Sequence, residues 1–304
     1  MNQARYAVRH DTLYSYSAPV VLSRQLLHVT PRECAWQNCE AHHITIDPAP
    51  NEWEERLDYF GNPEAHFALE TPHAELLVRA DSVVAVRSRA VDPETASSPA
   101  WEDARAALRS PNEAASLEAC QFLYESPYVR GFPRLAEFSA SLFPPGRPVL
   151  DAAVALMRYI HSEFEFDPAA TTVTTPLNEV IEDRRGVCQD FAHLMIACLR
   201  AHGIAARYIS GYLLTLPPPG KPRLVGADAS HAWVSVFVPG LGWIDFDPTN
   251  DQLPDTQHVT VAWGRDFSDV SPLRGVILGG GEHEVDVQVT VEPLAESSQT
   301  PATD

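Results

Sequence analysis

Basic residues are scarce in this sequence. It has 22 lysines and arginines against 41 acidic residues, which gives a formal net charge of −19 at pH 7. Proteins bind nucleic-acid backbones and anionic lipid surfaces chiefly by neutralising phosphates with Lys and Arg. The charge balance therefore argues against nucleic acid and against a membrane surface as partners.

Long apolar stretches are missing as well. The first residues, Met1 to Tyr6, lack the apolar block of a secretory signal, and no segment has the unbroken apolar length that a membrane span needs. The five cysteines are an odd number without the spacing of a disulfide framework, so they fit reduced thiols. We expect a soluble, cytoplasmic protein.

Signatures of metal and phosphate sites are weak. Cys34, Cys39, His42 and His43 are close in sequence, but Cys-x4-Cys-x2-His is not a usual zinc spacing, and adjacent histidines on a strand point to opposite faces. The run Gly279–Gly281 lacks the G-x-G-x-x-G pattern and precedes no helix, so it predicts a turn. We expect neither a metal nor a cofactor.

The chain does contain the patterning of a multi-part globular protein. With 304 residues, of which 45% are hydrophobic, it can bury a substantial core. Alternating apolar and polar positions predict an antiparallel, β-rich N-terminal domain over residues 1–90. Prolines and serines from Asp92 to Pro99 interrupt this pattern and begin a linker and helical segment over residues 91–149.

One helix is predicted within residues 91–149. In Ser110-Pro111-Asn112-Glu113, the serine can cap a helix, proline suits the first helical position, and the glutamate can complete a capping box. We predict a helix from this point through about Tyr124.

Two further helices are predicted between residues 150 and 203. The second of them runs from Cys188 to about His202, where Gly203 supplies a stop, and its apolar stripe makes it the expected central helix of the core. The first begins near Asp151 and has an apolar stripe interrupted by one histidine: Val154, Met157, His161 and Phe164.

Strand patterns follow these helices. They lie at Ile204–Leu214, Ala232–Val238 and Trp243–Asp247, separated by a Pro217–Gly220 loop and a Pro239–Gly242 turn. Residues 150–250 are therefore expected to form an α+β catalytic core. Residues 251–293 are expected to be a C-terminal β extension whose apolar face covers a sheet, and the composition of residues 294–304 indicates a disordered tail.

A thiol stands where the central helix begins. Cys188 follows the turn Arg184–Val187 directly. The unpaired amide groups and the positive dipole at a helix start favour a thiolate over a thiol and attract a developing oxyanion. Cys188 is therefore a candidate nucleophile, although a cysteine in this position is more often an inert buried thiol.

A hairpin would bring two further groups together. If the strand after His231 folds back about Pro239-Gly240, direct pairing places His231 opposite Asp247. Asp247 would then hold one ring nitrogen of His231 and leave the other for Cys188. Opposed residues share a face, so Val234, Val236, Ile244 and Phe246 should face the core, and the other face should carry His231, Trp233, Trp243, Asp245 and Asp247.

Three motifs in this order resemble the bacterial transglutaminase-like family. They are Gly-Val-Cys-Gln-Asp-Phe-Ala-His at residues 186–193, His-Ala-Trp-Val at 231–234 and Phe-Asp-Pro-Thr-Asn at 246–250. The likeness extends to Asp58-Tyr59-Phe60-Gly61-Asn62 near the start of the chain. It implies a papain-like, transglutaminase-like core, in which a helix carrying the cysteine packs on an antiparallel sheet, with Cys188, His231 and Asp247 as the catalytic triad.

Neighbouring side chains are candidates for supporting roles. Gln189 and Asp190 follow the cysteine, and a capping role is favoured for Asp190. Asp245 is a rival partner for His231, but the Asp-Pro-Thr match favours Asp247. We therefore expect Asp245 either to be solvated or to contact residues of the site without belonging to the triad. We expect Trp233 and Trp243 in a wall of the site or in the core, His193 as a possible support, and Cys198 in the core.

The sequence thus predicts a thiol-dependent amide-bond hydrolase, similar to a cysteine peptidase, that acts on peptides or proteins. Transglutaminase-type acyl transfer to an amine is an alternative, because water and amines can both resolve a thioester. A non-catalytic peptide-binding scaffold is another. The sequence leaves the substrate, the second oxyanion donor and the oligomeric state open.

Overall fold

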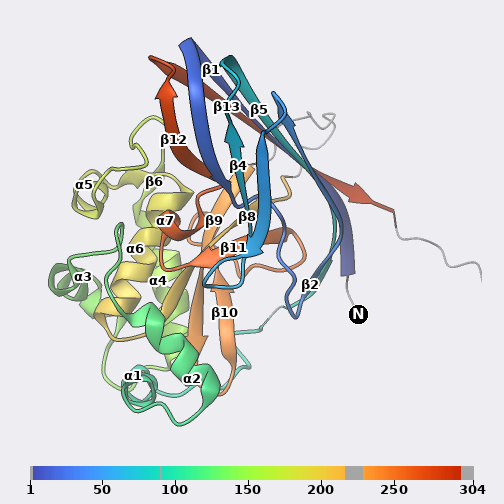
Figure 1. Cartoon of the computed structure of the whole chain (residues 1–304). Helices are drawn as coiled ribbons and strands as arrows, with labels where there is room; N and C mark the ends of the chain where they lie inside the picture. Colours follow the sequence, from blue (N-terminus) through green and yellow to red (C-terminus); the bar gives the residue numbers. More distant parts are fainter. Residues whose placement is uncertain (1–2, 90, 216–228, 296–304) are drawn as a thin grey trace, which may run out of the picture.

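The computed structural model of the chain describes residues 3–89, 91–215 and 229–295. Two antiparallel sheets and a layer of helices make up the molecule (Figure 1). The Pro217–Gly220 loop lies outside the described residues, as do residues 296–304 of the tail predicted to be disordered over 294–304; Leu294, its first residue, belongs to a strand.

The larger sheet is built around one long strand, β1 (Gln3–Leu27), which pairs with β5 and β13 along its first half and with β4 and β12 along its second half. Every pairing is antiparallel, as predicted. The strand order is β2-β5-β1-β4-β3, with β12 and β13 on β1. The other strands are β2 (Gln37–Asp47), β3 (Glu52–Leu57), β4 (Pro63–Leu69), β5 (His73–Arg87), β12 (Leu273–Gly279) and β13 (His283–Leu294).

The C-terminal extension is part of this sheet and also covers part of the smaller one. We predicted that residues 251–293 would lay an apolar face over a sheet, and β13 does so: Val289 and Val291 are buried in a core that also contains residues of the smaller sheet. The edge pairing of β12 and β13 with β1 was not predicted; backbone groups on an open strand edge gain hydrogen bonds from further strands. The predicted turn at Gly279–Gly281 is confirmed, with a positive φ at each glycine.

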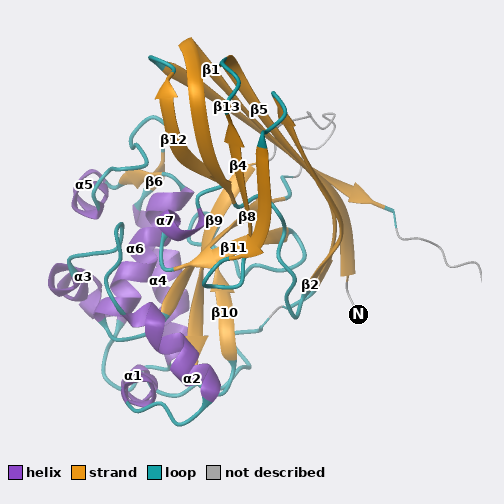
Figure 2. Cartoon of the chain, viewed as in Figure 1, coloured by secondary structure: helices purple, strands orange, loops and turns teal. Residues whose placement is uncertain are grey.

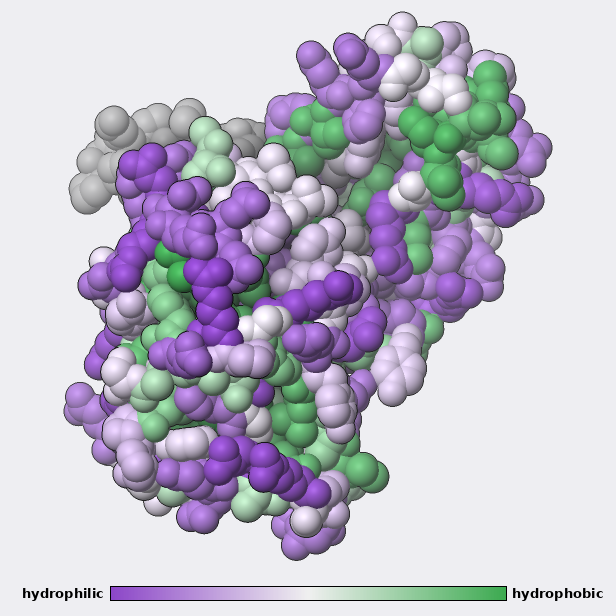
Figure 3. Space-filling model, turned by 90° about the vertical axis from the view of Figure 1, so that its left-hand side faces the viewer, coloured by the Kyte–Doolittle hydropathy of each residue, from purple (hydrophilic) through white to green (hydrophobic). Residues whose placement is uncertain are grey.

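The joined strands leave hydrophobic side chains exposed. Figure 3 shows hydrophobic surface on the upper lobe, which the larger sheet forms. Val276 and Leu278 of β12 and Val285 and Val287 of β13 are exposed.

The smaller sheet has the order β10-β9-β8-β11, again antiparallel. The predicted strands correspond to β8 (Ala206–Leu213), β9 (Ala229–Val238) and β10 (Gly242–Phe246). The outer strand β11 (His258–Gly264) was not predicted as a separate element.

The helices form a layer on this smaller sheet (Figure 2). They are α1 (Trp101–Arg109), α2 (Ala114–Ala119), α3 (Phe132–Ser139), α4 (Val149–Glu163), α5 (Leu177–Asp183), α6 (Cys188–Ala201) and α7 (Phe267–Val270), with the 3-10 turns η1 (Cys120–Leu123) and η2 (Ala140–Leu142) and the short strands β6 (Glu165–Phe166) and β7 (Arg185–Gly186). Of these helices, α4, α6 and α7 are in contact with the strands of the sheet, and others pack on these helices. No helix among the described residues has the length and hydrophobicity to cross a membrane.

The helix start predicted at Ser110 is wrong. Ser110 is the C-cap of α1, which was not predicted, and α2 begins four residues later after Glu113 without a side-chain cap. Pro111 accounts for the end of α1 at Arg109, because a residue before proline is kept out of the helical region, and Ser110 has φ −137° and ψ 66°. The α-helix ends at Ala119, earlier than predicted, and a 3-10 turn, η1, follows it to Leu123.

The two long helices follow the sequence patterns more closely. Helix α4 begins near Asp151 and buries Val154 and Met157 as predicted, but His161 is exposed and its Nδ1 lies 2.9 Å from the Thr249 carbonyl. Helix α6 is the central core helix, buried from Asp190 to Arg200.

A stack of cations and indoles joins the two sheets. The Arg32 guanidinium, from the segment after β1, lies 3.3 Å from the centre of the Trp263 ring, and Arg207 of β8 lies 3.8 Å from the same ring. Arg207 also lies 4.2 Å from the Trp243 ring. Arg32 and Arg207 are buried, which is costly for a cation, and the indole faces stabilise their charges by cation–π attraction.

Side-chain amides from the N-terminal part of the chain form hydrogen bonds with the backbone of the outer strand β11. The Gln37 amide donates to the Thr260 carbonyl and accepts from the Thr260 N–H, at 2.7 and 2.8 Å. Asn62 makes the same pair of contacts with the backbone of Trp263, both at 2.9 Å. These amides supply the hydrogen bonds that an outer strand lacks.

We expect Trp263→Ala to destabilise the fold by about 3–5 kcal/mol, because the substitution removes a large packed ring and uncovers two cations. Urea unfolding followed by circular dichroism measures this. Tyr59→Ala, at an 83% exposed position, is the control and should change stability by roughly 0.5 kcal/mol or less. An unchanged midpoint for Trp263→Ala would show that the stack is not what joins the sheets.

Candidate active site

Cys188 is the first residue of α6 and is half-buried. The turn before it is held by Asp190, whose Oδ2 accepts hydrogen bonds from the Val187 N–H at 2.9 Å and from the Thr171 hydroxyl at 2.6 Å. A Cβ on Gly186 would lie 2.8 Å from that carboxylate oxygen, so only glycine allows the close approach. Asp190 thus makes the capping contact that was favoured for it.

The β9–β10 hairpin has a different register from the predicted one. Asp245 pairs with Ser235 and Phe246 with Val234, so the turn is centred on Gly240 instead of on Pro239. Direct opposition of His231 and Asp247 is therefore wrong by two residues. The predicted faces survive because a shift of two leaves every side chain on its own side of the sheet.

Asp247 reaches His231 diagonally from just beyond the end of β10. Its Oδ2 accepts a hydrogen bond from His231 Nε2 at 2.8 Å. Both residues are buried, and the Asp247 side chain is completely inaccessible. The other ring nitrogen of His231 is not used by Asp247, and the neighbouring Cys188 is one of the groups that raise the pKa of His231.

The buried carboxylate is surrounded by donors. Its Oδ1 accepts from the backbone N–H groups of Thr249 and Asn250, at 3.0 and 3.2 Å. Its Oδ2 accepts from the Asn250 amide at 2.8 Å and from His258 Nε2 at 3.2 Å, besides His231. Burial alone would raise the pKa of Asp247, but the hydrogen bonds from His231 and His258 and the positive charge of His231 lower it, so Asp247 is an anion.

The same contacts fix the protonation of His231. Burial alone would lower the pKa of His231, but its hydrogen bonds to Asp247 and Cys188, together with their charges, raise it to about 10. At neutral pH the ring is therefore an imidazolium between a carboxylate and a sulfur. This is the arrangement that can donate a proton to a leaving group.

Asp245 has a different partner. Its Oδ2 accepts from the Trp233 indole N–H at 3.0 Å and lies 3.0 Å from an Arg89 Nη2, and the residue is buried. Of the two positions expected for Asp245, the solvated one is wrong, because the residue is buried, and the supporting one is confirmed. Asp245 holds Trp233, which packs beside His231.

The remaining sequence candidates lie in structural positions. The Gln189 amide donates to the Val173 carbonyl at 3.3 Å. His193 accepts from the Phe267 N–H at 3.2 Å and stacks on Tyr128, while Cys198 is completely buried. Trp243 packs against Phe122 in a cluster of buried apolar side chains. His42 contacts Thr30 and Ser82, each at 2.9 Å.

Sequence reasoning missed His258, Asn250 and Gly211. Asn250 belongs to a motif that was noted, but its contact with Asp247 depends on the turn after β10. His258 follows a loop on the outer strand and had no local pattern. Gly211 on β8 opposes His231, and a Cβ there would lie 2.5 Å from the Trp233 ring and 2.2 Å from the Val259 carbonyl.

His231, Asp247 and His258 also form a set that could present metal ligands. One atom of each lies within 4.8 Å of the others. The carboxylate oxygen that both imidazoles approach also accepts from the Asn250 amide, which lies 3.4 Å from His231 Nε2. A cation would meet that N–H group, so the set fits donors around an anion better than ligands around a metal.

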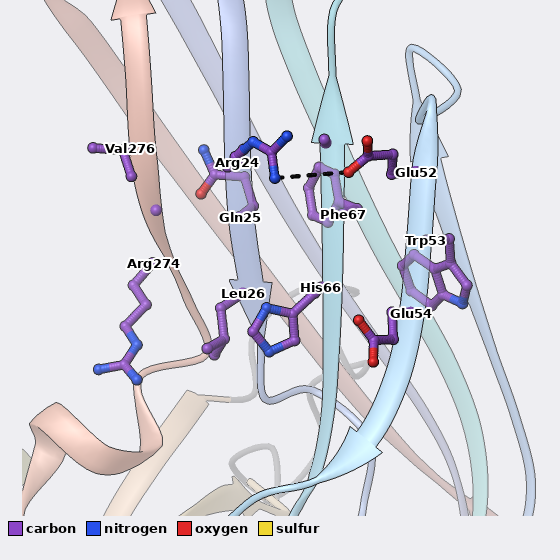
Figure 4. Close-up of a pocket in the computed structure, with 12 residues that line it drawn as sticks. Arg24, Gln25, Leu26, Glu52, Trp53, Glu54, His66, Phe67, Arg274 and Val276 are labelled. Atoms are coloured by element: carbon purple, nitrogen blue, oxygen red, sulfur yellow. Dashed lines mark ion pairs between the residues drawn. The ribbon is translucent and has the colours of Figure 1, made fainter.

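A separate hollow of 640 Å³ lies on the larger sheet, between β1, β3, β4 and β12 (Figure 4). Its walls include the ion pair of Arg24 and Glu52 at 3.7 Å and the Trp53 ring stacked on Phe67. None of the candidate catalytic residues lines it.

A half-buried cysteine at the start of a core helix, beside a histidine–aspartate pair on an antiparallel sheet, is the arrangement of papain-like thiol proteins. Residues 6–85 match the bacterial transglutaminase-like N-terminal region, and residues 137–248 match the transglutaminase-like superfamily. An uncharacterised Mycobacterium tuberculosis protein is 43% identical over 298 residues, which cover 95% of this chain and 93% of that protein. The chain belongs to the transglutaminase-like superfamily.

Other comparisons are more limited in what they show. A proposed cysteine protease from Cytophaga hutchinsonii has the same fold, with a TM-score of 0.75 at 22% identity over 97% of this chain and 92% of that one. The protein-glutamine gamma-glutamyltransferase of Pseudomonas aeruginosa is 35% identical over 112 residues, or 36% of this chain and 17% of that protein.

We expect Gly211→Ala to destabilise the protein by roughly 1–3 kcal/mol or more, because the added methyl group overlaps the Trp233 ring and a backbone carbonyl. Urea unfolding measures the loss. Displacing Trp233 also disturbs His231, so the alkylation rate of Cys188 should fall in the folded variant. Stability and reactivity equal to those of the wild type would contradict the close packing at this glycine.

Asp247→Asn should lower the pH at which His231 loses its proton by roughly one to three units, because the substitution removes the anion that favours the imidazolium. Nitrogen NMR of the imidazole across a pH series measures this. The matched control is Asp245→Asn, which removes the carboxylate bonded to Trp233 and should leave the titration of His231 nearly unchanged. Equal shifts in the two variants would mean that Asp247 is not the specific partner.

Proposed function

We propose that the protein is a thiol-dependent amide-bond hydrolase, similar to a cysteine peptidase, that acts on peptide or protein substrates and needs no cofactor. The observation that carries this proposal is the contact chain from Cys188 through His231 to the buried Asp247. It supplies a nucleophile, an acid–base group and an orienting anion in one place.

The first half of the reaction follows from the charges. The Cys188 sulfur attacks the amide carbonyl carbon as a thiolate, with the His231 imidazolium beside it. The amide groups at the start of α6 stabilise the oxyanion of the tetrahedral intermediate. His231 then donates its proton to the departing amine, the carbon–nitrogen bond breaks, and a thioester remains on Cys188.

The second half resolves the thioester. The now neutral His231 accepts a proton from water, which attacks the carbonyl carbon and releases the acid and the Cys188 thiolate. An amine could attack in place of water, which would give acyl transfer. The named activity of the Pseudomonas relative favours this alternative, but that likeness covers only 36% of this chain.

A hollow beside the first turn of α6 is our candidate for substrate binding. It measures 290 Å³ and lies between the segments 127–131 and 174–178. Val173, next to one wall, bonds to Gln189, and Tyr128 in the other wall stacks on His193 of α6. Arg130 is the cation of this lining and could pair with a substrate carboxylate.

We also propose a cytoplasmic location. All five cysteines are free thiols, which suits a reducing compartment. Detection of the protein in the membrane or extracellular fraction of its own cells would refute this.

The test incubates the protein with mixed peptides, including glutamine peptides, and a labelled primary amine. We expect hydrolysed products, lost in Cys188→Ala and reduced by roughly 10²–10⁴ in kcat for Asp247→Asn, because the imidazole loses its orientation. Incorporation of the amine that depends on Cys188 would favour acyl transfer. If no product of either kind depends on Cys188, the scaffold alternative gains and the enzymatic proposal fails.

A further inference from the structure

We propose that His258 is a positioning residue of this site, which holds Asp247 through its Nε2–H group and shares that carboxylate with His231. The inference rests on the proposed function and adds to it a residue outside the Cys-His-Asp set. It is carried by the geometry around one buried oxygen, Asp247 Oδ2, which His231 Nε2 and His258 Nε2 approach to 2.8 and 3.2 Å.

The fold holds His258 firmly in this place. The residue starts β11, with only 1% of its surface exposed. Its ring meets the Trp233 ring edge-on, with centroids 5.1 Å apart, and lies 6.0 Å from the His231 ring. Gly211 of β8, the strand between β9 and β11, pairs with His231 on one side and with Thr260 on the other. Because Gly211 has no side chain, the Trp233 ring fits over it.

The tautomer of His258 follows from its partner. An ionised carboxylate only accepts hydrogen bonds, so Nε2 of His258 must carry the proton. Nδ1 of the same ring is buried and has no hydrogen-bond partner among the described residues. Protonation of Nδ1 would therefore create a buried cation with one unsatisfied N–H group.

The surrounding charges agree with a neutral ring. Burial lowers the pKa of His258, and the positive charges of His231 and Arg89 lower it further, against the opposing effect of Asp247. Because His258 stays neutral, it acts as a fixed dipole that donates to the carboxylate across the neutral pH range.

The hydrogen bond from His258 changes how strongly Asp247 holds the proton of His231. A donor on Oδ2 stabilises the carboxylate charge and weakens its hold on the His231 proton. Without His258, the imidazolium would persist to a higher pH and Asp247 would lose one restraint on its orientation. The neutral imidazole that accepts a proton during thioester hydrolysis would then be scarcer, so turnover should fall even though Cys188 remains reactive.

The experiment compares His258→Gln with His258→Asn. The glutamine amide reaches the position of Nε2 and can still donate to Asp247, whereas the asparagine amide is one bond too short. Iodoacetamide alkylation of Cys188, followed by peptide mass spectrometry over a broad pH series, reports the pH at which His231 deprotonates beside the thiolate. We expect this upper inflection to rise by about one pH unit in His258→Asn, equivalent to a tenfold change in proton affinity, and to stay near the wild-type value in His258→Gln.

A structural role alone would not produce this pair of results. The proposal is overturned if His258→Asn has the wild-type profile, or if His258→Gln is displaced as far as His258→Asn. Should His258→Asn not fold, nitrogen NMR of the wild-type protein decides. A neutral His258 ring protonated at Nε2 supports the proposal, and a ring protonated at Nδ1, or at both nitrogens, at neutral pH overturns it.

A third variant separates this inference from the proposed function. His231→Ala should abolish the upper inflection, because the titrating imidazole is gone. If His231→Ala retains the wild-type profile, the Cys188–His231 pair does not govern reactivity and the proposed function fails with it. If His231→Ala abolishes the inflection but the two His258 variants do not differ, only the role of His258 is refuted.

Discussion

The buried negative charge of Asp247 is the constraint on which the site depends. A carboxylate without solvent access is tolerable only if hydrogen-bond donors replace water. Backbone amides, an asparagine side chain and two imidazoles do so here. Those donors come from β9, from the turn after β10 and from β11, so the charge can be satisfied only when the smaller sheet is fully assembled.

The covering of this sheet explains why the acid can be so deeply buried. One face of the smaller sheet packs on α6, and the other is closed by the segments of the larger sheet that carry Arg32, Gln37 and Asn62. The N-terminal domain is thus a wall of the core as well as a sheet of its own. Low access of water to this face strengthens the electrostatic pairing between Asp247 and His231.

Sequence patterns predicted the elements whose contacts lie between residues close together in the sequence. The apolar spacing and terminal glycine of α6 predicted that helix closely, and the Pro-Gly turn predicted the β9–β10 hairpin and its faces. The predicted register was wrong by two residues, because the turn is centred on Gly240. A shift of two residues leaves every hydrophobic side chain on the same face, so the sequence pattern does not distinguish the two registers. His258 could not be anticipated, since its contact with Asp247 depends on strands that meet only in the tertiary structure.

The long first strand has a consequence for how the chain is made. β1 is synthesised before the catalytic core, and its partners β12 and β13 are synthesised after it. Contacts this distant in sequence form slowly because a large loop must close before they are gained. During translation β1 therefore has an unpaired edge, and the nascent chain would need protection from non-native strand pairing until β12 and β13 have left the ribosome.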